Sequence, residues 1–174
     1  MTIVPFVPSP KPVVKRMLEL ADIKPGELVY DLGAGDGRIV IEAVKGFNAK
    51  GVAVEIRPDL IERINENVRK EGVRDSIHVI KGDLYKVKLS KADVVTLYLT
   101  SDMNAKLRFK LERELKPGAR VVAHDFPVLG WKPREVLKVK YEGEVHKIFL
   151  YKMPIIKDLR KELEVSFNRV KRRI

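Results

Sequence analysis

Apolar residues follow two alternating spacings along the chain, and these spacings predict alternating strands and helices. Short, nearly continuous apolar runs, typical of parallel strands buried on both faces, occupy residues 28–32, 51–54, 77–82, 92–99 and 119–123. Between these runs, apolar side chains recur three and four residues apart, which places them on one face of a helix. The pattern therefore predicts an α/β fold, a mostly parallel sheet with helices on both faces.

Proline and glycine mark the boundaries of the other elements. Pro58 suits the first turn of a helix, whereas Gly46 and Gly72 lie near helix ends, where glycine offers a left-handed exit. Glu142-Gly143 joins two apolar stretches near the C-terminus and predicts a hairpin turn. We expect helices at residues 12–22, 40–47, 58–68 and 103–115, and an antiparallel edge hairpin of residues 136–139 and 145–151.

The first predicted strand ends in an unusual stretch, Asp31-Leu32-Gly33-Ala34-Gly35-Asp36-Gly37-Arg38. Alternate glycines allow a sharp turn into the next helix and let a ligand approach the backbone. Position 38 is arginine where the dinucleotide-binding pattern has its third glycine. The carboxylate of Asp31 suits an ammonium group better than a pyrophosphate. The spacing therefore favours a nucleoside ligand that carries an amino acid.

Two further acids follow the next two apolar runs. Glu55 lies 20 residues after Gly35, where a carboxylate can accept hydrogen bonds from both ribose hydroxyls, and Asp83 follows the third run. Together with the glycine turn, these acids resemble the motifs of the Rossmann-like, seven-strand methyltransferases, which bind S-adenosylmethionine at this turn. In that family, an acid at the position of Asp83 meets the adenine amino group.

Composition limits the classes of protein to consider. The 174 residues suit one domain, and the absence of cysteine excludes disulfides, thiolate zinc sites and the cysteine nucleophile of cytosine carbon-5 methylation. The net charge of +11 suits nucleic acid or acidic proteins as partners, or only good solubility. Glutamine is also absent and 34% of residues are charged, which favours a hot growth environment.

The sequence predicts neither a membrane span nor a metal site. It contains no run of eighteen apolar residues, and its first residues lack the regions of a signal peptide, so we expect a cytoplasmic protein. The three histidines, His78, His124 and His146, are dispersed along the chain, and His124-Asp125 alone offers too few ligands for a metal. We therefore expect S-adenosylmethionine as cofactor and no metal.

Several stretches narrow the resemblance to the archaeal protein-lysine methyltransferases. They are the start Val4-Pro5-Phe6-Val7-Pro8-Ser9-Pro10, the glycine turn, residues 95–99, residues 111–122, and His124-Asp125-Phe126 with Gly130-Trp131. This group is similar in its core to the non-SET histone-lysine methyltransferases and to the mitochondrial lysine methyltransferases of the ATP synthase c subunit. The likeness runs from residue 4 to residue 153, so we assign residues 1–153 to the methyltransferase domain.

The resemblance implies which residues hold the cofactor. Asp31 and the glycines would hold the methionine end, Glu55 the ribose and Asp83 the adenine, while the proline-rich start would close over the ligand. The implied cofactor-binding set is Val7, Ser9, Asp31, Gly33, Ala34, Gly35, Gly37, Glu55, Ile56, Asp83 and Leu84.

The same resemblance implies a channel for the substrate lysine, lined by Phe6, Tyr98 and Trp131. The start of the chain also suits a staple on the first helix, and Tyr98 and Trp131 also suit ordinary packing. The reaction needs a neutral amine, and free lysine has a pKa near ~10.4, so an apolar channel beside the sulfonium cation would favour the neutral form. Tyr98, Asp102 and His124 are weak candidates for a general base.

The implied function is methyl transfer from S-adenosylmethionine to the side-chain amines of protein lysines. We expect broad specificity, including methylation of lysines of the protein itself. The alternatives are methyl transfer to RNA or to a small molecule of the corrin-precursor type, and non-catalytic cofactor binding. The fourth strand leads into residues 96–102, which lack the motif of Asn, Asp or Ser, two prolines and then an aromatic residue that marks methylation of amide or exocyclic base nitrogens. This absence argues against only one kind of RNA methylation.

Residues 154–174 form a predicted basic amphipathic helix outside the resemblance. From Ile156 to Ile174, apolar residues recur three and four apart, among seven basic and three acidic residues. We expect this helix either to pack against the domain or a second subunit, or to contact an acidic protein or nucleic acid.

Overall fold

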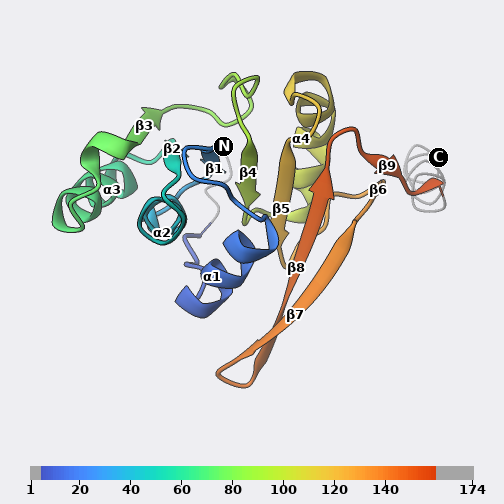
Figure 1. Cartoon of the computed structure of the whole chain (residues 1–174), viewed down its shortest axis with the longest axis horizontal. Coiled ribbons are helices and arrows are strands. Elements are labelled where there is room, and N and C mark those ends of the chain that lie inside the picture. The colour runs from blue at the N-terminus through green and yellow to red at the C-terminus, as the bar shows by residue number, and fades with distance from the viewer. Residues whose placement is uncertain (1–4, 160–174) are drawn as a thin grey trace.

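A computed structural model describes residues 5–159 and confirms the α/β fold (Figure 1). Seven strands form one mixed sheet in the order β3-β2-β1-β4-β5-β8-β7, parallel from β3 to β5 and antiparallel at β8 and β7. The strands are β1 Leu28–Leu32, β2 Lys50–Glu55, β3 Ile77–Lys81, β4 Val94–Leu97, β5 Arg120–His124, β7 Glu135–Tyr141 and β8 Glu144–Lys152. The helices are α1 Lys11–Leu20, α2 Arg38–Phe47, α3 Pro58–Lys70 and α4 Ser101–Glu114, with a 3₁₀ turn at Arg74–Ser76.

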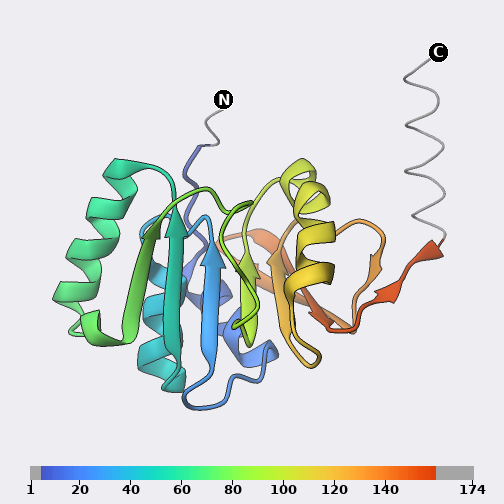
Figure 2. The ribbon, with the colours of Figure 1, turned by 90° about the horizontal axis from the view of Figure 1, so that it is seen from above.

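Helices cover both faces of the sheet, as the periodicity predicts (Figure 2). On one face, α1 and α2 pack Met17 and Ile39 against a core that contains Val122. On the other face, α4 packs Leu107 into a core that contains Val121. Since successive side chains of a strand point to opposite faces, β5 contributes to both cores and must be apolar almost throughout.

The strand order reverses between β1 and β4, which is where open α/β sheets bind ligands. In the parallel register, Asp31 at the end of β1 lies opposite Ala53 of β2 on one side and Thr96 of β4 on the other. The chain leaves β1 at this point and turns into α2. The topology therefore places the glycine turn at the switch point of the sheet.

Gly46 is not the left-handed exit of α2, although the helix ends at residue 47 as predicted. The left-handed residue that ends α2 is Asn48, with φ of 54°, whereas Gly46 is still helical. Asparagine tolerates the left-handed conformation, and Asn48 donates its N–H back to the carbonyl of Val44 at 3.1 Å. The helix therefore continues through its glycine.

The predicted C-terminal helix is also wrong at residues 154–158, which contain no helix. Ile156–Lys157 form a short strand, β9, that pairs antiparallel with β6, Trp131–Lys132. The N–H of Asp158 also donates to the carbonyl of Gly130 at 2.9 Å, so the chain returns to the domain after residue 153. The rest of the predicted helix, residues 160–174, lies outside the described residues, and the division at residue 153 stays a prediction.

Within residues 5–159, no helix is both long and apolar enough to cross a membrane.

Candidate functional site

The glycines of the turn all adopt a left-handed backbone. Gly33, Gly35 and Gly37 have φ of 82°, 59° and 81°, a region that other residues rarely adopt. The N–H groups of Gly33 and the buried Ala34 donate to the carbonyl of Val54 at 2.9 and 3.0 Å, which fastens the turn to β2. The turn therefore has a fixed shape that depends on glycine.

Glu55 fixes the same turn from the end of β2. Its carboxylate is buried and accepts hydrogen bonds from the N–H of Gly35 at 2.9 Å, of Ile56 at 2.8 Å and of Arg57 at 3.0 Å. A carboxylate has about four acceptor positions, so these bonds leave room for a ligand hydroxyl. Glu55 therefore lies at the end of β2 and shapes the turn, and its contact with the ribose stays a prediction.

Asp31 is a buried acid with one close partner. Only 2% of its surface is exposed, and the hydroxyl of Thr96 donates to its Oδ1 at 2.7 Å. Burial raises the pKa of Asp31 to about 7, against the lowering effect of the Thr96 hydrogen bond, and the charges of Glu55 and Asp36 raise it further. A cationic ligand beside Asp31 would favour the ionised carboxylate and gain a charged hydrogen bond.

The third acid, Asp83, lies half-buried after β3. Its Oδ1 accepts the N–H of Tyr85 at 2.9 Å, and the adjacent Gly82 donates its N–H to the backbone carbonyl of Glu55 at 2.9 Å. Leu84 is half-buried against the core, whereas Ile56 is 44% exposed. The ends of β1, β2 and β3 thus present three carboxylates along one edge of the sheet.

The proline-rich start crosses the glycine turn. A Cβ on Gly35 would lie 2.4 Å from the ring of Phe6, so this ring rests directly on the turn. The guanidinium of Arg63 on α3 lies 5.9 Å from the centre of the same ring, while Val7 is 59% exposed. The structure therefore brings Phe6 to the predicted cofactor site, and it leaves the side chain of Val7 in contact with solvent.

Arg38, which stands where the dinucleotide-binding pattern has its third glycine, binds both the start of the chain and the glycine turn. Its Nη1 donates to the backbone carbonyl of Ser9 at 2.9 Å, and its Nε and Nη2 donate to the carboxylate of Asp36 at 3.0 and 2.6 Å. The arginine thereby ties the start of the chain to the glycine turn. The sequence marks this position as an exception but does not reveal its partner.

Ser9 links the start of the chain to β5. Its buried hydroxyl and Nδ1 of His124 are hydrogen-bonded at 2.8 Å, and the ring of Tyr98 stacks on that of His124, with centres 4.0 Å apart. Burial lowers the pKa of His124 to about 4, so the imidazole is neutral at pH 7. Two predicted site residues, Tyr98 and His124, therefore lie together next to the proline-rich start of the chain.

Trp131 is buried, whereas Asp102, the other remaining candidate, is exposed. The Nε1–H of Trp131 donates to Glu112 at 2.7 Å, and its ring meets Tyr151 edge-on with centres 5.3 Å apart. These contacts are those of a packing residue, and a role in the lysine channel stays a prediction. Asp102 is exposed in the first turn of α4.

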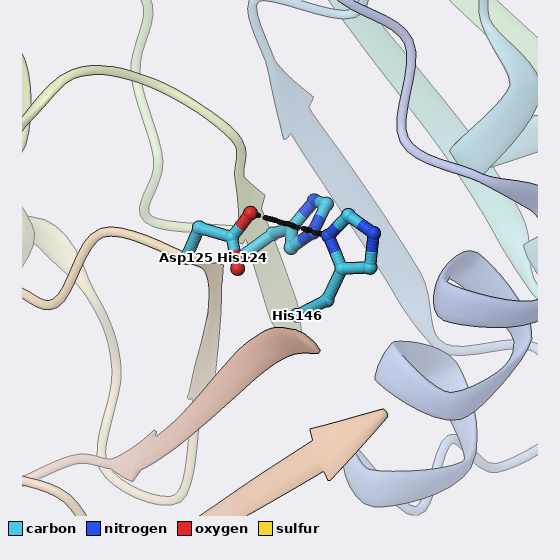
Figure 3. A group of neighbouring side chains, drawn as sticks. All are labelled: His124, Asp125 and His146. Carbon is cyan, nitrogen blue, oxygen red and sulfur yellow. Dashed lines mark hydrogen bonds and ion pairs between the residues drawn. The ribbon is translucent and has the colours of Figure 1, made fainter. Parts of the chain in front are cut away.

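The histidines are less dispersed than the sequence indicates (Figure 3). The antiparallel register sets His124 opposite Ile148, which brings His146, two residues earlier on the same face of β8, beside it. Asp125 completes a group of three side chains with possible ligand atoms. The expectation that His124 and His146 are apart is therefore wrong, because it ignored the pairing of β5 with β8.

Comparisons with known proteins identify the family of this chain. Residues 31–135 match the family model described as the ANTKMT methyltransferase domain. A protein-lysine N-methyltransferase from Saccharolobus islandicus is 48% identical over 149 residues, which cover 85% of this chain and 92% of that protein. The human lysine N-methyltransferase of the ATP synthase c subunit is 39% identical over 133 residues, which cover 76% of this chain but only 56% of that protein.

A solved structure extends the comparison to the ligand. The crystal structure of an RNA methyltransferase from Salinibacter ruber in complex with S-adenosyl-L-homocysteine has a TM-score of 0.80 and 46% sequence identity, over 85% of this chain and 94% of that chain. In the present chain, a glycine turn without Cβ atoms and the buried carboxylates of Asp31 and Glu55 fit such a ligand. The chain belongs to the ANTKMT methyltransferase family and has the seven-strand methyltransferase fold.

Proposed function

We propose that the protein methylates the side-chain amine of lysines in other proteins and in itself. The observation that carries this proposal is the match to the Saccharolobus protein-lysine N-methyltransferase, which extends over 92% of that relative and therefore includes the substrate-facing ends of the strands. The human relative, named for a lysine of the ATP synthase c subunit, supports the same class of substrate.

The residues at the three strand ends suit the parts of the cofactor. We assign Asp31 to the ammonium group, Glu55 to the ribose and Asp83 to the adenine amine, while the Phe6 ring covers the glycine turn that Glu55 shapes. When bound, S-adenosylmethionine supplies an electrophilic methyl group on a sulfonium. The contribution of the protein is to hold the acceptor amine in line and to exclude water.

The acceptor lysine must arrive as a neutral amine. The aromatic rings of Phe6 and Tyr98 lie near the proline-rich start of the chain. An apolar surface of this kind disfavours the charged ammonium form of the lysine. His124 is not suited to remove the proton itself, because both of its ring nitrogens already have partners, Ser9 and His146. We propose that desolvation of the amine is the main source of its reactivity.

Exposed lysines on the protein's own surface support the proposal of self-methylation as part of a broad specificity. The β7–β8 hairpin projects from the edge of the sheet (Figure 1) and carries exposed lysines, among them Lys138, Lys140 and Lys147. An exposed lysine on a projecting hairpin of one molecule is sterically available to the site of another.

A mixed-protein assay tests this specificity. The purified protein is incubated with labelled S-adenosylmethionine, first alone and then with a protein extract. Mass spectrometry of digested products should find methyl groups on lysines of the protein itself and of several unrelated proteins. Label on one protein only, or on no lysine, would contradict broad specificity.

RNA is the second candidate substrate, because the Salinibacter relative is described as an RNA methyltransferase and the present chain has a net charge of +11. Basic charge attracts phosphate backbones without regard to sequence. Label that is released by ribonuclease, with none released by protease, would favour this alternative.

A further inference from the structure

Three ligand atoms of His124, Asp125 and His146 converge on one point at the carboxyl end of β5 (Figure 3). Nε2 of His124 lies 3.0 Å from Nδ1 of His146, and Oδ2 of Asp125 lies 3.3 Å from each of these nitrogens. The three atoms therefore form a nearly equilateral triangle. They come from β5, from the residue that follows it and from β8.

This triangle has the size of one face of a tetrahedral metal site. Zinc binds histidine nitrogen and carboxylate oxygen at about 2.0–2.1 Å, and at the tetrahedral angle two such ligand atoms lie about 3.3–3.4 Å apart. Sides of 3.0, 3.3 and 3.3 Å allow one ion above the triangle to reach all three atoms at ordinary bond lengths.

The remaining polar atoms of His124 and Asp125 are held in the way that metal ligands usually are. Nδ1 of His124 is hydrogen-bonded to the hydroxyl of Ser9 at 2.8 Å, and Oδ1 of Asp125 accepts the N–H of Lys147 at 2.8 Å. Nε2 of His146 faces the carboxylate of Glu144 at 4.0 Å. The partners of His124 and Asp125 are of the kind that orient metal ligands, whereas the Glu144 carboxylate is too far from Nε2 of His146 for a hydrogen bond.

One tautomer of His124, the one that metal binding through Nε2 requires, leaves the triangle short of protons when no metal is bound. If Nδ1–H of His124 donates to Ser9, its Nε2 is a lone pair, and a neutral His146 can place at most one proton among the three facing atoms. Two acceptors would then share that proton. Asp125 also adopts a left-handed backbone with φ of 58°, which turns its carboxylate back toward the histidines.

We propose that His124, Asp125 and His146 bind a divalent transition-metal ion of the zinc type through Nε2, Oδ2 and Nδ1. Two imidazoles and one carboxylate suit such ions better than they suit magnesium or calcium. The side chain of Asp125 is 28% exposed, so this corner of the triangle is open to solvent. The ion would hold the ring of His124 in place. This ring stacks on Tyr98 and is hydrogen-bonded to the hydroxyl of Ser9 in the proline-rich start of the chain.

Cobalt and zinc binding test this site without any assay of methyl transfer. The full chain is dialysed against a chelator and then titrated with Co²⁺, followed by its visible absorption, and with Zn²⁺ by calorimetry. We expect one ion per chain, and a visible spectrum of four- or five-coordinate cobalt. His146→Ala and Asp125→Asn should each weaken binding by ~100-fold or more, and Ser9→Ala by roughly 10-fold, as for an outer partner.

His78→Ala is the matched control, because His78 is the third histidine of the chain and lies exposed on β3, away from the triangle. It should bind one ion with unchanged affinity. Absence of a one-to-one complex in the parent chain would overturn the proposal, as would equal zinc affinity in the parent, His146→Ala and Asp125→Asn proteins. Circular dichroism of each variant separates a lost ligand from a lost fold.

Discussion

The carboxylate of Glu55 accepts the backbone N–H of Gly35 at 2.9 Å, so one buried side chain holds the glycine turn in shape. The proposed function also assigns Glu55 to the ribose of the cofactor. Glu55→Gln removes the charge and replaces one acceptor oxygen with an N–H₂ group, which cannot accept a backbone N–H. Hydrogen bonds to charged groups contribute about 1.5–3 kcal/mol, so we expect S-adenosylhomocysteine to bind roughly 10- to 150-fold more weakly. Calorimetry measures this change.

Glu62→Gln is the control for that measurement, because Glu62 is an exposed acid on the neighbouring helix α3. Its affinity should match that of the parent protein. Equal affinity in the Glu55→Gln variant would remove Glu55 from the cofactor site.

The close approach of Phe6 to Gly35 predicts coupling between these two positions. Gly35→Ala puts a Cβ 2.4 Å from the Phe6 ring, in a left-handed backbone that costs alanine about 1–2 kcal/mol. Phe6→Ala removes the steric part of this penalty and leaves the backbone part. We therefore expect Gly35→Ala to lower the melting temperature less in the Phe6→Ala background than in the parent. Additive losses in the double variant would show that the ring does not rest on the turn in solution.

The raised pKa of Asp31 predicts a dependence of ligand binding on pH. The pKa of about 7 lies above the ordinary 3.8, so below pH 7 the free protein holds Asp31 mostly protonated. Binding of the ammonium of S-adenosylhomocysteine must then release this proton, and affinity should rise with pH up to about 7 and level off above it. Asp31→Asn should bind weakly at all pH values from 5.5 to 8, with no such rise. A parent affinity that is flat across this range would contradict the pairing of Asp31 with the ligand.

The raised pKa of Asp31 also predicts how the stability of the fold depends on pH. A carboxyl whose pKa is higher in the folded chain holds more protons when folded than when unfolded between its unfolded value and about 7. The free energy of unfolding therefore loses a contribution as the pH rises through this window. In Asp31→Asn this part of the decline should be absent. Denaturant titrations of the parent and the variant at pH 5 and pH 8 measure the difference in their free energies of unfolding.

Truncations separate the two parts of the C-terminal segment. A chain that ends at Met153 loses β9, which pairs with Trp131–Lys132, whereas a chain that ends at Leu159 keeps it. We expect the shorter chain to melt at a lower temperature than the chain of 159 residues. If residues 160–174 contact RNA or acidic proteins, the chain that ends at Leu159 should lose affinity for them and show a weaker salt dependence. Identical melting of the two truncations would contradict a structural role for β9.

The sequence predicted the elements whose signals are local. Each parallel strand is a run of apolar residues that fills two cores, as Val121 and Val122 do, and the glycines of the turn are required by their own backbone angles. These signals need no knowledge of distant residues. The sheet, the turn and the positions of Asp31 and Glu55 therefore followed from periodicity and spacing.

The features that the sequence did not predict depend on partners far along the chain. Arg38 contacts Ser9, and His146 meets His124 only because β8 returns antiparallel beside β5. Ile156 fits the spacing of a helix, yet its backbone pairs with Lys132. A cytoplasmic location and a hot habitat, inferred from composition, stay predictions.

Methyl transfer to a defined peptide distinguishes lysine methylation from the methylation of RNA in a single experiment. The protein is incubated with labelled S-adenosylmethionine and either a peptide with one lysine, the same peptide with arginine at that position, or a mixed RNA. We expect that only the lysine peptide gains methyl groups, located on its side-chain amine by mass spectrometry. Methylated RNA together with an unmodified lysine peptide would contradict the proposed function.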